Sequence, residues 1–452
     1  MTFFYAIILL GILIFVHELG HFLFAKMVNV KVLRFSLGFG PRVLGKKYGE
    51  TEYQISAVPL GGYVKMLGEE PGDEISDEDR ARAYNLQPVG KRILIVLAGP
   101  VFNILFAAIV FIALFLAGIP VARPYIGKIT EQSPAAKVGL MTGDKVVAIN
   151  GIAIESWDDI DASTNNNPGK PLLFKIEREG TITEIPVTPV RKSEKNIFGE
   201  EKEVWDIGIV PLISSEIGEV VKGSSADKAG VMKGDRVIEI EGKKIKMWQD
   251  LTAIIHDSPG KSLRFRLKRD DRMMELSITP EKSAFTMPTG EKKEIGLIGV
   301  RPMTSDFMKR FNLIDAMNLG IRKTWETSFL TFVVVIKLIQ RIVPADTLGG
   351  PIMIFQMAGE QAALGAMSFF AFMAVLSINL GVLNLLPIPI LDGGHVMFLT
   401  FEAIRRKPLS ERVMMIAQKV GLMFIVTLMA FVLYNDFLRI VLPWLKKILS
   451  MG

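Results

Sequence analysis

Residues 93–119 form an uninterrupted run of 27 residues without a charged side chain, directly after the basic pair Lys91 and Arg92. A predominantly apolar segment of about 20 residues can cross a bilayer core about 30 Å thick as a helix. Within lipid the backbone must satisfy its own hydrogen bonds, which leaves a single segment of this kind no fold but the helix. The run therefore predicts a membrane-spanning helix.

Three further segments have the same character. The N-terminal segment is apolar except at His17 and Glu18, and it lacks the basic start and small-residue cleavage site of a signal peptide. Residues 361–391 carry no charge but contain Pro387 and Pro389, which break a helix. We predict four spans, over residues 3–28, 93–119, 369–386 and 420–435.

The basic residues of the loops predict the orientation of these spans. Residues 31–92 carry ten Lys and Arg, and four more lie in the short loop 405–412. With four spans both loops fall on one side, which the positive-inside rule makes cytoplasmic. The long region 120–360 is then expected outside. Within it, residues 329–336 are apolar but too short to span, and predict an amphipathic helix on the outer membrane surface.

An internal repeat occupies the region between the second and third spans. Residues 126–211 match residues 217–302 at a constant offset of 91, without a gap. The matched positions include Gly143-Asp144 with Gly234-Asp235, and Trp157 with Trp248. A gapless match of this length indicates two copies of one domain of about 90 residues.

The charge of the chain divides along the same boundaries. Residues 122–302 contain 28 Lys and Arg and 28 Asp and Glu, so the formal charge of +6 lies entirely outside the repeat. The surplus therefore belongs to membrane topology, and it gives no support to nucleic-acid binding. The chain has no cysteine, which leaves only histidine and carboxylate side chains as protein ligands for zinc.

A metal-binding pattern interrupts the first predicted span. His17-Glu18-Leu19-Gly20-His21 is an H-E-x-x-H motif, in which the two histidines lie on one face of a helix and can reach one zinc ion. Glu18 lies about 100° around the helix, where it can act as a general base on water. Ionisable residues inside a span are costly, which by itself indicates a functional site.

A third ligand must also lie in a membrane segment, because catalytic zinc sites usually have three protein ligands and one open position. Asp392 ends the long apolar run at the proline-broken end of the third predicted span. His395 is an alternative ligand, although we favour a supporting or loop position for it. Both the histidine pair and Asp392 fall toward the cytoplasmic ends of their helices under the predicted topology.

The H-E-L-G-H run in the first span and the N-x-x-P-x-P-x-L-D-G run at residues 384–393 resemble the site-2 protease family of intramembrane zinc metalloproteases. The resemblance covers nearly the whole chain, and Gly99-Pro100 with Asn103 matches the family's small-residue pattern in the second span. It implies one zinc ion per chain. It implies the following roles: His17, His21 and Asp392 as ligands, Glu18 as catalytic base, and Asn384 and Asn379 as residues that handle the substrate.

The two repeat copies resemble PDZ domains, which bind a peptide C-terminus as an added strand. The matching runs Ile207-Gly208-Ile209 and Ile298-Gly299-Val300 near the end of each copy suggest the circular permutation of bacterial PDZ domains, and they are the candidate peptide-binding residues. The copies could equally be spacers or a size filter without ligands. The resemblance further implies a bacterial inner membrane and a regulated intramembrane protease whose partners are single-span protein substrates, such as anti-sigma factors and remnant signal peptides.

The expected architecture is a multi-domain membrane protein. It has an α-helical core of four spans, a membrane-associated β-hairpin within residues 32–66, with strands at 32–39 and 53–58, and two circularly permuted α+β PDZ domains, each a partly open β-barrel. The expected domains are residues 1–120 and 369–452 for the membrane core, 121–212 and 213–303 for the PDZ copies, and 304–368 for an interfacial helical region. The alternatives are a membrane-anchored PDZ scaffold without activity, a metal transporter, and a zinc protease of soluble peptides.

Overall fold

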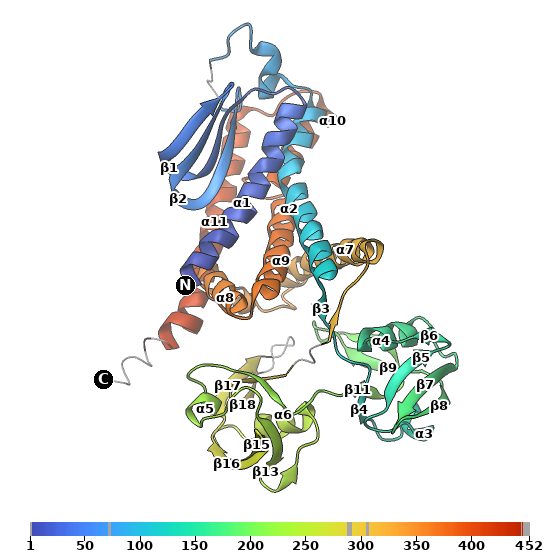
Figure 1. Ribbon diagram of the computed structural model, residues 1–452. Helices are drawn as coiled ribbons and strands as arrows, with labels where there is room; N and C mark the ends of the chain where they lie inside the picture. Colours follow the sequence, from blue (N-terminus) through green and yellow to red (C-terminus); the bar gives the residue numbers. More distant parts are fainter. Residues whose placement is uncertain (1, 71–73, 287–291, 304–306, 444, 446–452) are drawn as a thin grey trace. The chain divides into compact units, whose positions relative to one another are not determined.

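The computed structural model describes residues 2–70, 74–286, 292–303, 307–443 and 445. The chain divides into two compact units (Figure 1). The membrane unit consists of residues 1–117 and 311–452, and the repeat unit consists of residues 118–310. The chain thus leaves the membrane unit once and returns to it once, and the repeat unit is a single insertion.

The membrane unit is mainly helical. Four of its helices are long and apolar enough to cross a membrane, as the sequence predicts, at Phe3–Met27, Val89–Ala117, Ala366–Asn384 and Arg412–Val441. Its helices are α1 (Thr2–Met27), α2 (Val89–Ala117), α7 (Leu313–Ile339), α8 (Pro351–Ala363), α9 (Ala366–Asn384), α10 (Asp392–Arg405) and α11 (Glu411–Asp436). Short 3₁₀ turns lie at Arg80–Arg82, Tyr84–Leu86 and Ala345–Thr347, and a π-helical turn follows α11 at Phe437–Val441.

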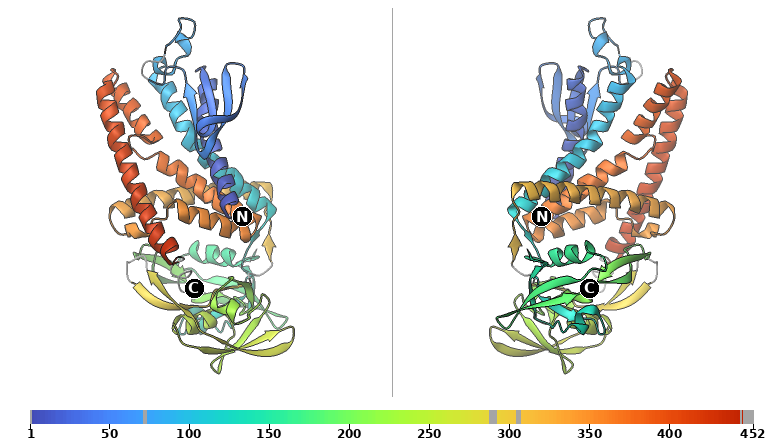
Figure 2. Two further views of the ribbon diagram at one scale, coloured as in Figure 1. Left: turned by 90° about the vertical axis from the view of Figure 1, so that its left-hand side faces the viewer. Right: turned by 90° about the vertical axis from the view of Figure 1, so that its right-hand side faces the viewer.

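Helix α2 is the centre of this unit, since it packs against α1, α7, α9 and α10. Figure 2 shows α11 on the opposite side of the unit from the hairpin formed by β1 (Val32–Tyr48) and β2 (Thr51–Met66). Arg92 in the first turn of α2 forms a two-pronged ion pair with Glu402 of α10, with Nη–Oε distances of 2.5 and 3.2 Å. The basic loops 31–92 and 405–412 therefore leave the unit at the same end.

The apolar stretch at residues 329–336 belongs to a longer helix than its own length suggests. Helix α7 runs over 27 residues, and its start is capped by Asn312, whose side chain accepts a hydrogen bond from the Asp315 amide. It packs against α2 and α9, with Gly320 against Ile112 of α2. Large apolar side chains on it, among them Trp325 and Phe329, remain exposed, as expected for a helix in contact with lipid.

The hairpin is longer than the two strands predicted at 32–39 and 53–58. Strands β1 and β2 pair in antiparallel fashion from Val32 opposite Met66 to Tyr48 opposite Thr51. Residues 35–37 pair with 62–64 on one side and with 53–55 on the other, and residues 44–48 pair with 51–55, so the chain reverses direction at the glycine–proline pair at 40–41 and again at the glycine–glycine pair at 61–62. The predicted strands at 32–39 and 53–58 therefore match two of the four extended segments, and the other two, at 42–48 and 62–66, were not predicted.

The turn of the hairpin is anchored by charge. Both carboxylate oxygens of Glu50 accept hydrogen bonds from Arg82, and Lys26 at the end of α1 forms a further ion pair with it. The Arg82 hydrogen bonds, opposed by partial burial and aided by Lys26, lower the pKa of Glu50 to about 2. Arg82, in the charged stretch that follows the hairpin, thus anchors its turn, and Lys26 ties the turn to the end of α1.

The repeat unit contains two copies of one arrangement of elements. The first copy consists of β4 (Ile126–Ile129), α3 (Pro134–Lys137), β5 (Lys145–Ile149), β6 (Ile152–Ala153), α4 (Trp157–Asn165), β7 (Leu172–Arg178), β8 (Thr181–Val187), β9 (Val190–Lys195), β10 (Glu201–Asp206) and β11 (Ile209–Pro211). The second consists of β12 (Ile217–Val220), α5 (Ser225–Lys228), β13 (Arg236–Ile240), β14 (Lys243–Lys244), α6 (Trp248–His256), β15 (Leu263–Arg269), β16 (Arg272–Ile278), β17 (Glu281–Thr286), β18 (Lys292–Leu297) and β19 (Val300–Pro302). Every helix and strand of the second copy begins and ends 91 residues after its counterpart in the first copy, so the sequence offset is also a structural offset.

Each copy has its own apolar core and the same ion pair, in which the carboxylate is buried and the arginine partly exposed. In each core a four-stranded antiparallel sheet, β6-β5-β7-β8 or β14-β13-β15-β16, packs against a helix. The buried carboxylates Asp144 and Asp235 accept hydrogen bonds from Arg178 and Arg269 respectively. The short strands β3 (Ile119–Pro120) and β20 (Met308–Lys309) pair where the chain enters and leaves the unit.

Candidate metal centre

The H-E-x-x-H motif ends at His21, six residues before the end of helix α1 at Met27. His17 and His21 lie four residues apart on α1, so both rings project from one face toward α2. The rings lie edge to face, with centroids 4.8 Å apart. Gly99 of α2 makes room for them, since a methyl group there would lie 2.3 Å from Nε2 of His21.

Asp392 reaches the same place from the other end of the chain. It is the first residue of α10, where the helix dipole favours a carboxylate. The proline-containing segment 385–391 folds back over the first turn of α10, so that methyl groups at Gly393 and Gly394 would lie 2.3 Å from the carbonyl oxygens of Leu385 and Ile388. Only glycine fits at these two positions, and the tight fold sets where Asp392 points.

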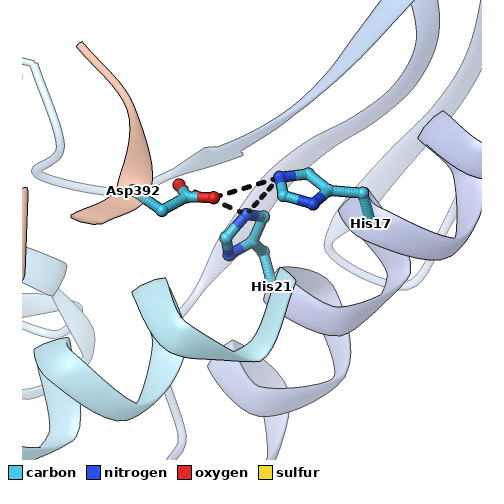
Figure 3. Close-up of side chains that lie close together, drawn as sticks. All are labelled: His17, His21 and Asp392. Carbon is cyan, nitrogen blue, oxygen red and sulfur yellow. Dashed lines mark hydrogen bonds and ion pairs between the residues drawn. The ribbon is translucent and has the colours of Figure 1, made fainter. Parts of the chain in front are cut away.

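Figure 3 shows the three side chains converging. Nε2 of His17 lies 3.2 Å from Nε2 of His21 and 3.2 Å from Oδ2 of Asp392, and Nε2 of His21 lies 3.7 Å from Oδ1 of Asp392. The histidine side chains are each 12% exposed and the aspartate 18%. Over the described part of the chain, this is the one cluster of three or more such side chains with ligand atoms close enough for a metal ion.

These distances fit a metal ion. Tetrahedral ligands about 2.0–2.1 Å from zinc lie roughly 3.3 Å from one another, close to the observed separations. Oδ2 of Asp392 is buried without a hydrogen-bond partner among the described residues, although its carboxylate faces two imidazoles. A buried carboxylate oxygen in this condition is expected to bind a cation.

Helix α2 contacts the far side of both rings. Nδ1 of His21 lies 2.9 Å from the carbonyl oxygen of Ile95, to which it donates, and Nδ1 of His17 lies 3.1 Å from the side-chain nitrogen of Asn103. The donation by His21 leaves its Nε2 without a proton and free to bind a metal. Ile95 and Asn103 were not predicted as site residues. A polar side chain at 103, inside an uncharged span, was the available signal for Asn103.

Glu18 lies beside the hairpin. A methyl group at Gly62 of β2 would lie 3.0 Å from its Cγ atom, so the absence of a side chain at Gly62 leaves space for Glu18. The expected general base is thus on α1, adjacent in sequence to His17 and next to a strand of the hairpin.

The other expected residues occupy separate places. Asn384 ends α9, eight residues before Asp392. Asn379 lies within α9, and its Oδ1 accepts a hydrogen bond of 2.8 Å from the hydroxyl of Thr331 on α7. His395 lies in the first turn of α10 and is outside the cluster of His17, His21 and Asp392.

Part of the backbone of the candidate peptide-binding runs is already hydrogen-bonded within each copy. The carbonyl oxygens of Ile207 and Gly208 accept hydrogen bonds from Ala135 and Thr130. In the second copy, the carbonyl oxygens of Ile298 and Gly299 accept hydrogen bonds from the amides of Ala226 and Val221. Ile209 on β11 pairs with β4, and Val300 on β19 pairs with β12. In the described chain β11 and β19 have no further strand partner, so their second edges are unpaired.

Comparison with known proteins places this arrangement in a family. Residues 5–428 match the model of peptidase family M50, and the chain belongs to this family of site-2 zinc metalloproteases. The regulator of sigma-E protease of Escherichia coli K12 is 36% identical over 454 residues, covering 96% of this chain and 98% of that protein.

Two more relatives cover almost the same length. The protease of this type from Yersinia pestis is 35% identical over 445 residues, covering 96% of this chain and 98% of its own length. A protein of Neisseria meningitidis serogroup A named for zinc metalloprotease activity is 35% identical over 439 residues, with 95% and 97% covered. A solved PDZ domain from Listeria monocytogenes, 20% identical, covers 21% of this chain and 90% of its own, with a TM-score of 0.16.

Proposed function

We propose that this protease cleaves single-span membrane proteins within the membrane, using one zinc ion held by His17, His21 and Asp392, with Glu18 as the general base. The observation that carries the proposal is the convergence of these three ligands, from the first span and from α10, at distances that suit zinc. All three side chains lie in a unit built around four apolar helices.

The chemistry follows from the ligands and the base. A zinc ion in this position supplies a Lewis acid for the scissile carbonyl and lowers the pKa of water to about 7. Glu18 takes a proton from the attacking water and delivers it to the leaving amine. Two nitrogen ligands and one carboxylate leave a fourth position for water and substrate.

The hairpin offers a way to present the substrate. A peptide bond inside a helix is shielded by its own hydrogen bonds, so the substrate must first be extended. We infer that the substrate adds as a strand to the β1–β2 hairpin, which is supported by the position of Gly62 against Glu18. Asn384 would bind the substrate backbone. Asn379 can bind the substrate backbone only if its hydrogen bond with the Thr331 hydroxyl is replaced by one with the substrate.

The basic loops support an orientation. Residues 31–92 and 405–412 leave the same end of the membrane unit, as the ion pair of Arg92 with Glu402 requires. We infer that this end is cytoplasmic, that the active site lies in the bacterial inner membrane toward this side, and that the repeat unit is outside. His395 would support the site from the first turn of α10 without binding the metal.

For the repeat unit we infer two circularly permuted PDZ domains that recognise peptide C-termini or exclude substrates not yet shortened. Support comes from the unpaired second edges of β11 and β19, next to Ile207-Gly208 and Ile298-Gly299. The sigma-E names of the relatives support substrates of the anti-sigma-factor type, with remnant signal peptides as a second class.

Reconstitution in lipid tests the proposed function. The purified chain, placed in vesicles with a single-span fusion protein, is expected to cut that protein within its apolar segment. A chelator should abolish cleavage and added zinc should restore it. Mass spectrometry of the products locates the cut. Cleavage of soluble peptides alone would instead support a surface protease, and a chain that cuts neither would support the scaffold alternative.

Gly99 provides a second test, through the space that it leaves for the rings. In Gly99→Ala the new methyl group must displace His21 or His17 by roughly 1 Å, and a shift of this size costs about 100-fold in rate. We expect kcat/KM in the vesicle assay to fall by about that factor. Gly90→Ala is the matched control, because it is in the same helix and its methyl group meets open space. Equal losses in both variants would contradict the proposed positions of the rings.

A further inference from the structure

Asn103 is a buried polar residue in the middle of α2 whose side chain faces the metal-binding rings. Its accessible surface is zero, and the span around it contains no charged residue. The side-chain nitrogen lies 3.1 Å from Nδ1 of His17. The side-chain oxygen is buried and has no hydrogen-bond partner among the described residues.

The two ends of a carboxamide have nearly the same shape, so the hydrogen-bond network decides which end faces a neighbour. If the nitrogen of Asn103 faces His17, it donates to Nδ1, and the proton of the neutral ring must then be on Nε2. That Nε2 lies 3.2 Å from both Nε2 of His21 and Oδ2 of Asp392, where a metal ion would bind. A protonated Nε2 has no lone pair to offer to a metal.

Turning the Asn103 carboxamide over removes this conflict. Its oxygen then accepts the proton of Nδ1, and the lone pair of Nε2 faces Asp392 and His21. The oxygen, which otherwise lacks a donor, also gains one. The backbone carbonyl of Ile95 already does the same for His21, since a carbonyl can only accept. Helix α2 would therefore set the tautomer of both rings.

We propose that Asn103 is a positioning residue, whose carboxamide oxygen accepts the Nδ1 proton of His17 and so directs Nε2 toward the metal. The inference rests on the proposed role of His17 as a ligand. Histidine ligands depend on such acceptors, whose loss typically lowers metal affinity by about 10- to 100-fold.

The test is the zinc affinity of the full-length protein in detergent, measured by competition with a chromophoric chelator. Asn103→Leu removes the acceptor and should weaken zinc binding by about 10- to 100-fold. Asn103→Asp keeps an acceptor and removes the donor, so its affinity should stay within about threefold of wild type, since carboxylate is a common partner of metal-bound histidine. If Asn103→Asp weakened zinc binding as much as Asn103→Leu, residue 103 would have to be a hydrogen-bond donor, and the proposal would be overturned.

Ser377→Ala is the matched control. The Ser377 hydroxyl donates to the backbone carbonyl of Asn103 over 2.8 Å, so this change loosens the same contact of α2 with α9 without touching His17. Its zinc affinity should remain within about twofold of wild type. Equal affinities of Asn103→Leu and wild type would also overturn the proposal. If Asn103→Leu does not fold, as judged by metal-free thermal unfolding, the contrast of Asn103→Asp with Ser377→Ala still decides. A wild-type protein that binds no zinc would instead refute the proposed function.

Discussion

Glu18→Gln is expected to lower kcat for an intramembrane substrate by about 10²–10⁴-fold, the usual contribution of a general base. Glutamine has nearly the same shape, so it still fits beside Gly62, but it cannot accept a proton from water at neutral pH. KM and the zinc content should stay close to wild type, because His17, His21 and Asp392 are unchanged. The measurement is initial cleavage rate in vesicles, with metal analysis of the same sample.

The matched control is Glu326→Gln. Glu326 lies on α7, half exposed, in an ion pair with Arg322, so the same chemical change occurs in the same unit but away from the metal centre. Its kcat should be unchanged. Equal cleavage by wild type and Glu18→Gln would remove Glu18 from the catalytic step, and would be the result expected if an accompanying protease were responsible.

Asp392→Ala is expected to weaken zinc binding by about 10²–10³-fold. Four-ligand zinc sites have apparent binding free energies of about 10–16 kcal/mol, or about 2.5–4 kcal/mol for each ligand. A loss of that size corresponds to the stated factor, since 1.4 kcal/mol is about tenfold. The two histidines alone should retain only weakly bound metal. Competition with a chelator measures the affinity, and cleavage should be lost in parallel at low free zinc.

His395→Ala separates Asp392 from its sequence neighbour. His395 is three residues further along the first turn of α10 but outside the cluster of ligand atoms, so its removal should leave zinc affinity nearly unchanged. If Asp392→Ala keeps its zinc while His395→Ala loses it, the third ligand is His395 and α10 must turn to present it.

The local parts of this fold were predictable from the chain. The two histidines share a face of α1 because four residues make about one turn, and a stretch such as 93–119 has few folds open to it in a membrane. The repeat was equally visible, because matched glycine and aspartate positions recur at 91 residues and the elements follow the same offset.

Strand length was harder to predict. The strands at 32–39 and 53–58 were predicted, but the neighbouring segments 42–48 and 62–66 were not, because their place in the sheet depends on pairing with those strands rather than on local preference. Helix α10 was not predicted for a related reason. Its sequence follows directly on an apolar run, and only its packing against α2 distinguishes it as a separate helix.

The sequence by itself limited the candidate zinc ligands to histidine and carboxylate side chains near apolar segments, predicted four apolar helices and showed that a domain is repeated, because these depend on residue type and on spacing along one element. Only the tertiary structure decided that Asp392 meets His21 across 371 residues, that Gly99 makes room for the rings, and that Asn103 faces His17. Such contacts join separate helices, and the packing of α1, α9 and α10 around α2 sets them.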